Sequence, residues 1–270
     1  MRVIPTGEIA PPYKRDMGLS QARGEILAFI DDDAYPVKNW LSNAVKNFVD
    51  PKVAAVGGPA VTPNEDNLMQ QASGLVYSSF VVGNIYAYRY VPKKRIEIED
   101  YPTCNLLIRR QIMQQVGGFN VCFWPGEDTK VCLEITKKLH YKIIYDPEVL
   151  VYHHRRMLFI PHLKQIANYA VHRGYFVKIF PETSFKFAYF IPSIFIVSLI
   201  LGAGLAWLFP GLRIAYLLFI SLYLVIVLLS SLFKNIFLIP LVFLGSILTH
   251  LTYGVCFLKG LFLLKLKEEK

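Results

Sequence analysis

The sequence contains few cysteines, and their spacing excludes the commonest cysteine-based structures. There are 4 cysteines in 270 residues, and no two of them form a Cys-x-x-Cys pair. This pattern favours a reduced compartment without a structural zinc site or a disulfide. The sequence also has no internal repeat or low-complexity segment, and the first eight residues lack the apolar core of a signal peptide.

Charged residues are scarce at the C-terminal end, where long apolar runs take their place. The chain is 54% hydrophobic, with a mean hydropathy of +0.37. Residues 188–209, 214–233 and 236–258 are apolar runs, each long enough to cross a bilayer. Their small number of charged groups disfavours a small transporter. The sequence therefore predicts a cytosol-facing part followed by an integral membrane tail.

A basic stretch precedes the first apolar run. Residues 155–186 contain six Lys or Arg (155, 156, 164, 173, 178 and 186) against one acid, Glu182. The positive-inside rule keeps such a stretch in the cytoplasm, where it can attract anionic headgroups or a lipid diphosphate. With three complete crossings, however, the basic tail would lie on the outer side of the membrane. This tail contains Lys259, Lys265, Lys267 and Lys270. Either one segment is re-entrant or the rule is broken here.

Three consecutive aspartates, Asp31, Asp32 and Asp33, follow a short apolar segment at 26–30. This segment has the length and composition of a buried strand, and buried parallel strands end where α/β proteins bind ligands. Adjacent carboxylates repel one another, so a cation or strong donors must hold them. Hard oxygen ligands suit Mg²⁺ or Mn²⁺ carrying substrate phosphates. The alternative is a surface Asx turn leading into the helix near Trp40.

A second acidic pair, Glu127-Asp128, follows Trp124-Pro125-Gly126 and opens a predicted helix. Acids favour helix N-termini because of the helix dipole, and this alone explains the pair. Together with the aspartate triplet, the pair also fits a site in which one carboxylate group holds a metal and another accepts a proton.

Histidine and arginine end the last predicted strand of the front half, in the order His153-His154-Arg155-Arg156. A neutral imidazole could complete a metal shell at the same sheet edge, and the arginines could neutralise a leaving diphosphate. A basic patch that holds lipid headgroups is an equal alternative for the arginines. His250 lies in the third apolar run, which suggests a function or a buried hydrogen bond.

Short apolar segments alternate with amphipathic ones in the front half, which predicts an α/β sheet. We expect a packed helix near the membrane surface in the aromatic segment 69–90. In the helix at 40–48 we expect Trp40, Leu41, Ala44, Val45 and Phe48 on one face. The other predicted helices are 110–116, with Gly117-Gly118 as its C-cap, and 128–139. The predicted strands are 26–30, 53–56, 106–108, 142–145 and 149–152.

The order of these motifs resembles that of a family 2 glycosyltransferase over residues 11–180. The resemblance rests on Phe29-Ile-Asp-Asp-Asp-Ala-Tyr-Pro36, Thr103-Cys-Asn-Leu-Leu-Ile-Arg-Arg110, Val116-Gly-Gly-Phe119, Gly126-Glu-Asp-Thr129 and Tyr152-His-His-Arg-Arg156. The tail is similar to that of the polysaccharide-assembly branch, with Gln165…Asn168-Tyr169…Arg173-Gly174 and His250-Leu-Thr-Tyr-Gly254. The Gln-x-x-Arg-Trp string of processive synthases is missing.

The resemblance implies a Rossmann-like GT-A fold and roles for individual residues on the donor side. Asp31 and Asp33 match the Asp-x-Asp motif, which meets the ribose of the nucleotide sugar and the divalent Mg or Mn on its diphosphate. His153 matches a third metal ligand. The further residues expected to contact the nucleotide sugar are Lys14, Arg15 and Arg156.

The resemblance also implies the acceptor side and the reaction. Asp128 matches the general base, Glu127 positions the acceptor or the base, and Gln165 and Arg173 line the acceptor or diphosphate channel. A single displacement with oxocarbenium character would invert the anomeric centre. At a helix N-terminus, Asp128 is expected to stay ionised near pH 7.

Family members begin with a Pro-x-Tyr-Asn-like strand and a strand whose final Asp holds the base, and neither precedes Asp31 here. We therefore expect residues 1–155 to form an N-terminally truncated, incomplete GT-A domain that lacks its nucleotide-binding strands. Residues 156–186 would form a basic amphipathic juxtamembrane segment, and residues 187–270 a transmembrane region of about three helices.

The sequence thus predicts a multi-pass plasma-membrane protein with a cytoplasmic catalytic domain and no nucleic-acid partner. It would move a sugar from a UDP- or GDP-sugar to a lipid-linked or polysaccharide acceptor in cell-envelope glycan synthesis. The alternative is a non-catalytic membrane scaffold or binding subunit. The missing strands favour this alternative, whereas the aspartate triplet and the Glu-Asp pair favour the enzyme.

Overall fold

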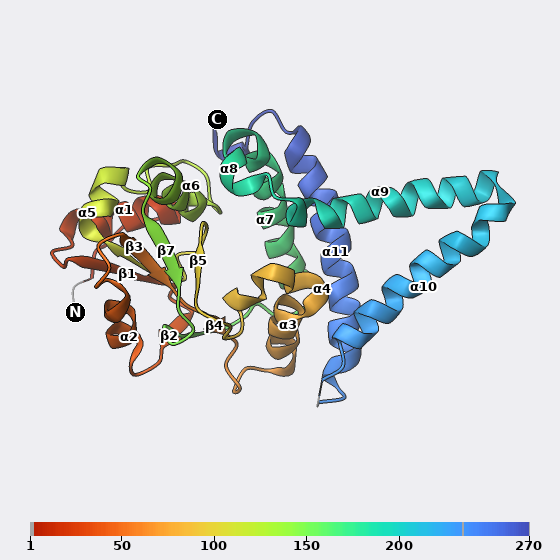
Figure 1. Cartoon of the computed structure of the whole chain (residues 1–270), viewed down its shortest axis with the longest axis horizontal. Coiled ribbons are helices and arrows are strands. Elements are labelled where there is room, and N and C mark those ends of the chain that lie inside the picture. Colours follow the sequence, from red (N-terminus) through yellow and green to blue (C-terminus); the bar gives the residue numbers. More distant parts are fainter. Residues whose placement is uncertain (1–2, 234, 270) are drawn as a thin grey trace.

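The computed structural model describes residues 3–233 and 235–269. Lys270 of the predicted basic tail lies outside the described residues. Figure 1 shows a body of strands and short helices, a layer of longer helices beside it, and a pair of long helices that extends away from both. The α/β class of the front half and the apolar helices of the back half are both as predicted from the sequence.

The body is built on a five-stranded mixed sheet in the order β1-β6-β3-β7-β5. β3 and β7 run parallel, and the other neighbours run antiparallel. All five residues of β3 are buried, which makes it the centre of the core. The strand bounds are Ile26–Ile30 for β1, Val53–Gly57 for β3, Ile96–Ile98 for β5, Asn105–Arg109 for β6 and Lys142–Tyr145 for β7.

β1 has the predicted bounds, but the expectation of a buried parallel strand was wrong. It pairs antiparallel with β6 and lies at an edge of the sheet. Ala28 and Ile30 are exposed in consequence. An apolar run alone does not reveal how many neighbours a strand has, and here a single neighbour is enough to order it.

A second, three-stranded sheet lies beyond the end of β1. It contains β2 (Ala34–Pro36), β8 (Val151–His153) and β4 (Ala60–Val61), in that order. β2 pairs antiparallel with β8, so that Ala34 faces His153. Strands as short as β2 and β4 show no periodicity, and the sequence predicted neither of them. This small sheet brings the end of the aspartate triplet beside the histidine pair.

The helices of the body include one that was not predicted, α1 (Pro11–Gln21). α2 (Trp40–Asn47) buries Trp40 and Ala44 as expected, but Leu41 and Val45 are exposed rather than inward. α5 (Arg110–Val116) ends at Gly117, whose φ of 80° is left-handed, as predicted for its C-cap. α6 (Glu127–Leu133) continues as a π-helix over Glu134–Lys138.

The helical layer beside the body is formed by α3 (Leu68–Ser78), α4 (Phe80–Gly83), α7 (Ile160–Ile179) and α8 (Pro181–Ser184). The single helix expected at 69–90 is broken at Ser79, whose extended backbone and side chain start α4 by accepting a hydrogen bond from the Val82 amide. A 3₁₀ segment, η1 (Asn84–Arg89), follows α4.

The long helices are α9 (Phe187–Leu208), α10 (Arg213–Ser230) and α11 (Leu238–Phe262). All three are long and apolar enough to cross a membrane. A short 3₁₀ turn, Pro210–Leu212, joins α9 to α10, and another, Lys267–Glu269, follows α11. In Figure 1, α9 and α10 form the hairpin that leaves the body, whereas α11 runs beside α7.

Candidate active site

The aspartate triplet forms the turn between β1 and β2. The carbonyl of Asp31 accepts a hydrogen bond from the Ala34 amide at 3.1 Å, and the carbonyl of Asp33 accepts one from the His154 amide at 3.0 Å. The backbone therefore turns sharply and is tied at once to β8. The hydrogen bonds of this turn are between backbone groups, so it is not the expected Asx turn, and it places Asp31 and Asp33 beside His153.

Asp31, Asp33 and His153 form a candidate metal-binding cluster, since one ligand atom from each lies within 4.8 Å of the other two. His153 Nε2 lies 2.9 Å from Asp33 Oδ1. This contact is the main cause that lowers the pKa of Asp33, which keeps that carboxylate charged. Two carboxylates and an imidazole form a donor set that suits a divalent cation.

Arg155 determines which nitrogen of His153 carries the hydrogen. Its Nη1 lies 2.7 Å from His153 Nδ1, and a guanidinium can only donate. Nδ1 therefore accepts, and Nε2 carries the hydrogen that faces Asp33. The carboxylates of Asp31 and Asp33 can bind a divalent cation in this arrangement. His153 can bind it only if Arg155 Nη1 moves away, because the guanidinium occupies the lone pair of the imidazole ring. Arg155 itself is buried and donates to the carbonyl of Ala60.

Arg15 connects the aspartate triplet to the distant Glu-Asp pair. It extends from α1 and forms ion pairs with Asp31, at 3.1 Å, and with Glu127. Burial raises the pKa of Glu127, and the charge of Arg15 opposes this shift. α1 is held in place by Asp16, whose carboxylate accepts hydrogen bonds from the amides of Phe119 and Asn120 at 2.8 and 3.0 Å. The two acidic groups found in the sequence thus lie in one site.

Asp128 stands at the start of α6, as predicted, and it is less fully ionised near pH 7 than the helix dipole alone led us to expect. Burial, together with the negative charges of Glu127 and Asp100, raises its pKa to about 7. The helix dipole argument considered only local structure, and the tertiary surroundings outweigh it. Near neutral pH this carboxyl is poised between its two protonation states, as a general base or acid requires.

Asp100 is a member of the site that the sequence reasoning missed. It follows β5, is 7% exposed, and accepts hydrogen bonds from Thr129 Oγ1 at 3.3 Å and from Arg173 Nη2 at 3.1 Å. Burial acts to raise its pKa, but the charges of Arg173 and Arg89 outweigh burial, so the pKa is lowered. The only available signal was the acidic pair Glu99-Asp100 directly after the alternating segment Ile96-Glu97-Ile98.

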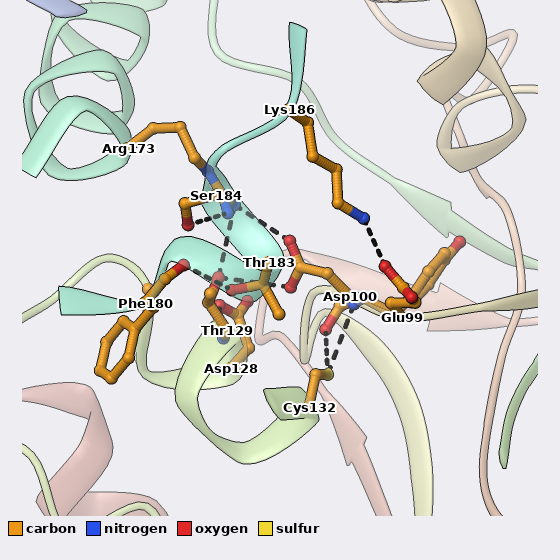
Figure 2. Close-up of polar contacts among 12 residues, drawn as sticks. Glu99, Asp100, Asp128, Thr129, Cys132, Arg173, Phe180, Thr183, Ser184 and Lys186 are labelled. Atoms are coloured by element: carbon orange, nitrogen blue, oxygen red, sulfur yellow. Dashed lines mark hydrogen bonds and ion pairs between the residues drawn. The ribbon is translucent and has the colours of Figure 1, made fainter. Parts of the chain in front are cut away.

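Arg173 links α6 to the helical layer. Figure 2 shows it reaching from α7 toward Asp100 and Thr129, and its Nη1 lies 3.3 Å from Ser184 Oγ of α8. Because Thr129 is the neighbour of Asp128, this arginine helps to hold the start of α6. It is thus engaged by the protein's own side chains.

The remaining predicted site residues lie outside this network. Lys14 and Arg156 are exposed, and neither side chain forms a hydrogen bond or ion pair with the part of the chain that the structure describes. Gln165 lies in the helical layer, where its Oε1 accepts a hydrogen bond from the hydroxyl of Tyr77 at 3.2 Å. The geometry thus assigns these three residues no contact with the acidic clusters.

A cavity of about 530 Å³ opens beside Asp100. It lies between η1, β5 and the start of α9. The ion pair between Lys186 and Glu99, at 2.6 Å, joins its walls. Its lining includes Tyr86, Tyr88, Arg89, Glu97, Lys186 and Tyr189. The cavity is therefore rich in aromatic rings and charged groups.

Comparison with known proteins agrees with the motifs of the front half. Residues 5–117 match the family model described as Glycosyl transferase family 2. This range includes Arg15, Asp31 and Asp33, and it ends before Glu127. The N-terminal part of the chain is thus similar to family 2 glycosyl transferase domains over residues 5–117.

Two curated relatives carry glycosyltransferase names. The pre-mycofactocin glycosyltransferase of Mycobacterium tuberculosis is 28% identical over 147 residues, which cover 54% of this chain and 30% of that protein. Glycosyltransferase AglE of Haloferax volcanii is 30% identical over 107 residues, which cover 39% of this chain and 32% of that protein. The matched part therefore spans less than a third of either relative.

Proposed function

We propose that the protein is a membrane-associated glycosyltransferase that moves a sugar from a nucleotide-diphosphate sugar to an acceptor at the lipid surface. The observation that carries the proposal is the position of Arg15 between Asp31 and Glu127. Arg15 joins the candidate metal-binding cluster to the acid pair at the start of α6. Long apolar helices extend from the same body. The matched family supports the reaction type.

On the donor side, Asp31 and Asp33 would hold a divalent Mg or Mn, with His153 as a third ligand. The cation supplies positive charge for the diphosphate of a UDP- or GDP-sugar as it leaves. Arg15 lies beside Asp31 and adds a guanidinium to the same region. Contacts of Lys14 and Arg156 with the nucleotide stay predictions.

On the acceptor side, Asp128 would take the proton from the attacking hydroxyl. A pKa of about 7 makes its carboxylate a stronger base than an ordinary aspartate, without removing the ionised form at neutral pH. Glu127 would position the acceptor, because Arg15 and the Gly126 amide, at 3.0 Å, fix its carboxylate. One base opposite the leaving group corresponds to a single displacement, which inverts the anomeric centre.

The cavity beside Asp100 suits a hydroxyl-rich acceptor. Tyr86, Tyr88 and Tyr189 offer aromatic faces, and the charges of its wall are largely paired, which favours neutral polar groups over a free anion. The Tyr86 hydroxyl is buried without a hydrogen-bond partner among the described residues, and it could bind such an acceptor. A lipid-linked or polysaccharide acceptor, Gln165 and Arg173 near its path, and a role in envelope glycan synthesis belong to this proposal.

The test is a donor screen with the full chain in lipid nanodiscs. UDP- and GDP-sugars are supplied with Mn²⁺ and a lipid extract, and release of the nucleoside diphosphate is measured. The proposal predicts release that requires both the extract and the cation. Metal-dependent nucleotide binding without release for any donor would instead favour the non-catalytic binding subunit.

A further inference from the structure

The third apolar helix differs from the other two in what it packs against. α11 follows α7 along most of its length, and its small residues allow close contact. A Cβ atom at Gly245 would meet Leu158, just before α7, and a Cβ at Gly260 would meet the Val171 carbonyl. Midway between them, Thr249 Oγ1 lies 3.0 Å from His162 Nε2. The contact is therefore continuous over several turns.

α7 in turn is held at both of its ends, by α3 of the helical layer near its start and by the body near its end. Near its start, His162 Nδ1 lies 2.8 Å from Ser73 Oγ of α3, and near its end Arg173 reaches Asp100. Packed helices lie about 8–10 Å apart, whereas a full crossing separates the ends of a helix by about 30 Å of hydrocarbon. A helix that stays in contact with α7 therefore remains close to the body throughout.

The end of α11 also returns to the body side. The hydroxyl of Tyr175 on α7 donates a hydrogen bond to Glu269 at 2.8 Å, and Lys178 donates to the carbonyl of Leu263. Figure 1 places the C-terminus beside α8, near the strands and helices of the body. A third crossing would carry this segment to the far side of the membrane.

Unlike α11, α9 and α10 leave the other helices over most of their length. α9 contacts α11 close to its own start, where Ser193 Oγ donates to the Gly254 carbonyl at 2.9 Å. Beyond that point apolar side chains such as Ile200, Trp207 and Leu217 are exposed. The hairpin leaves the body in Figure 1, and each of its helices is long enough to reach across a bilayer.

We infer that only α9 and α10 cross the bilayer, and that α11 lies along its near surface with an apolar face toward the lipid. Leu244, Val255 and Phe262 are exposed and spaced by eleven and seven residues, which places them on one side of the helix. The membrane is the occupant of this face because the face is continuous with the hairpin that enters it.

Charge agrees with two crossings. With two crossings, the exposed Lys259, Lys265 and Lys267 lie on the same side of the membrane as the basic stretch 155–186. Most Lys and Arg residues of the helical region then lie on one side, as the positive-inside rule requires, with Arg213 at the hairpin tip on the other, and these lysines can meet anionic headgroups. The conflict seen in the sequence arises from counting α11 as a span.

Labelling with a membrane-impermeant maleimide tests this topology in sealed vesicles of both orientations. The exposed native Cys122 reports the side of the body. In a Cys122→Ser background, Gly211→Cys reports the tip of the hairpin, where a Cβ meets no neighbour, and Lys267→Cys reports the tail. The Cys122→Ser chain alone is the control. We expect Gly211→Cys to label from the side opposite to Cys122, and Lys267→Cys from the same side as Cys122.

Two labelling outcomes overturn the inference. Labelling of Lys267→Cys from the side of Gly211→Cys would mean three crossings. Labelling of Gly211→Cys from the side of Cys122 would mean that the hairpin does not cross. Neither readout depends on sugar transfer, so the result stands whether or not the proposed function is correct.

A depth measurement separates a flat α11 from a crossing one directly. A fluorophore is attached at Leu244→Cys or Phe262→Cys in the same background and quenched by nitroxide lipids that carry the label at known depths. A helix along the surface gives both positions the same shallow depth. A crossing helix would separate them by about 27 Å over eighteen residues, and a difference of that order contradicts the inference. Ile200→Cys on α9 is the deep reference.

Discussion

We name the two acidic clusters after their proposed roles, the donor cluster (Asp31, Asp33 and His153) and the acceptor cluster (Asp100, Glu127 and Asp128), and they are held in contrasting ways. Asp33 of the donor cluster is 53% exposed and is positioned by a backbone turn and the pairing of β2 with β8. Asp100 of the acceptor cluster is 7% exposed and is positioned by the side chain of Arg173, which comes from the helical layer. The donor cluster thus depends on the sheet, whereas the acceptor cluster depends on a helix attached to the membrane region.

This difference predicts that substitutions in the two clusters impair different properties of the protein. Changes in the donor cluster should affect metal and nucleotide binding and leave the fold intact, because the Asp31 and Asp33 side chains are 33% and 53% exposed. Changes in the acceptor cluster should affect transfer and stability together, because charges there are buried. Arg15 connects the two clusters through its ion pairs with Asp31 and Glu127.

The largest effect is expected for Asp128→Asn. The amide cannot accept the proton of the attacking hydroxyl, so transfer should fall by roughly 10²–10⁴-fold. Mn²⁺-dependent nucleotide binding, measured by calorimetry on the same sample, should be unchanged because the donor cluster is intact. Loss of nucleotide binding would show that the two clusters are not separable in this way.

Next in size is Arg173→Met. It leaves Asp100 buried with only Arg89 as a charged partner, at 3.6 Å, and should lower the free energy of unfolding by about 3 kcal/mol. Asp100→Asn combined with Arg173→Met is the matched control, and it should regain part of the loss because the buried anion is gone, although Arg89 then lacks its ion-pair partner. Chemical denaturation of the protein in detergent measures both, and equal stability of the wild-type and Arg173→Met chains would refute the role of this pair.

Asp33→Ala should weaken metal-dependent nucleotide binding by roughly 100-fold, or about 2.7 kcal/mol, with little change in thermal stability. Asp32→Ala, at the neighbouring exposed position, is the control and should bind as the wild type does. If both variants retain full affinity for the nucleotide in Mn²⁺, the donor cluster does not hold the cation.

The smallest predicted effect is a displacement of the pH profile. Transfer requires ionised Asp128, so the rate should fall as the pH drops below about 7. Asp100→Asn removes a negative charge that raises the pKa of Asp128, and the acidic limb of the kcat profile should move to lower pH. If the acidic limb of the kcat profile stays in place or moves to higher pH, Asp100 does not raise the pKa of Asp128.

Local features of the site were predictable from the sequence, and tertiary ones were not. The apolar run before the aspartates gives β1 its bounds, and the motif order placed Asp31, Asp33 and His153 together. Asp100 escaped notice because its partner Arg173 lies far away in the chain and on another layer. The antiparallel partner of β1 escaped for the same reason, since strand pairing leaves little trace in a five-residue segment.

The ionisation of Asp128 illustrates the same limit. A helix N-terminus favours the charged form, and this can be read from the sequence. Burial and the neighbouring carboxylates of Glu127 and Asp100 favour the neutral form, and they appear only when the chain is folded. Burial and the neighbouring carboxylates thus affect the pKa of Asp128 more than the helix dipole does, and they cannot be read from the sequence.

The anomeric configuration of the product tests the central claim most directly. A donor with a defined α-linkage is converted by the full chain in nanodiscs, and the anomeric proton of the new glycosidic bond is examined by NMR. A single base opposite the leaving diphosphate predicts a β-linked product. A product that retains the α-configuration, or the absence of product from every donor that binds, would contradict the account.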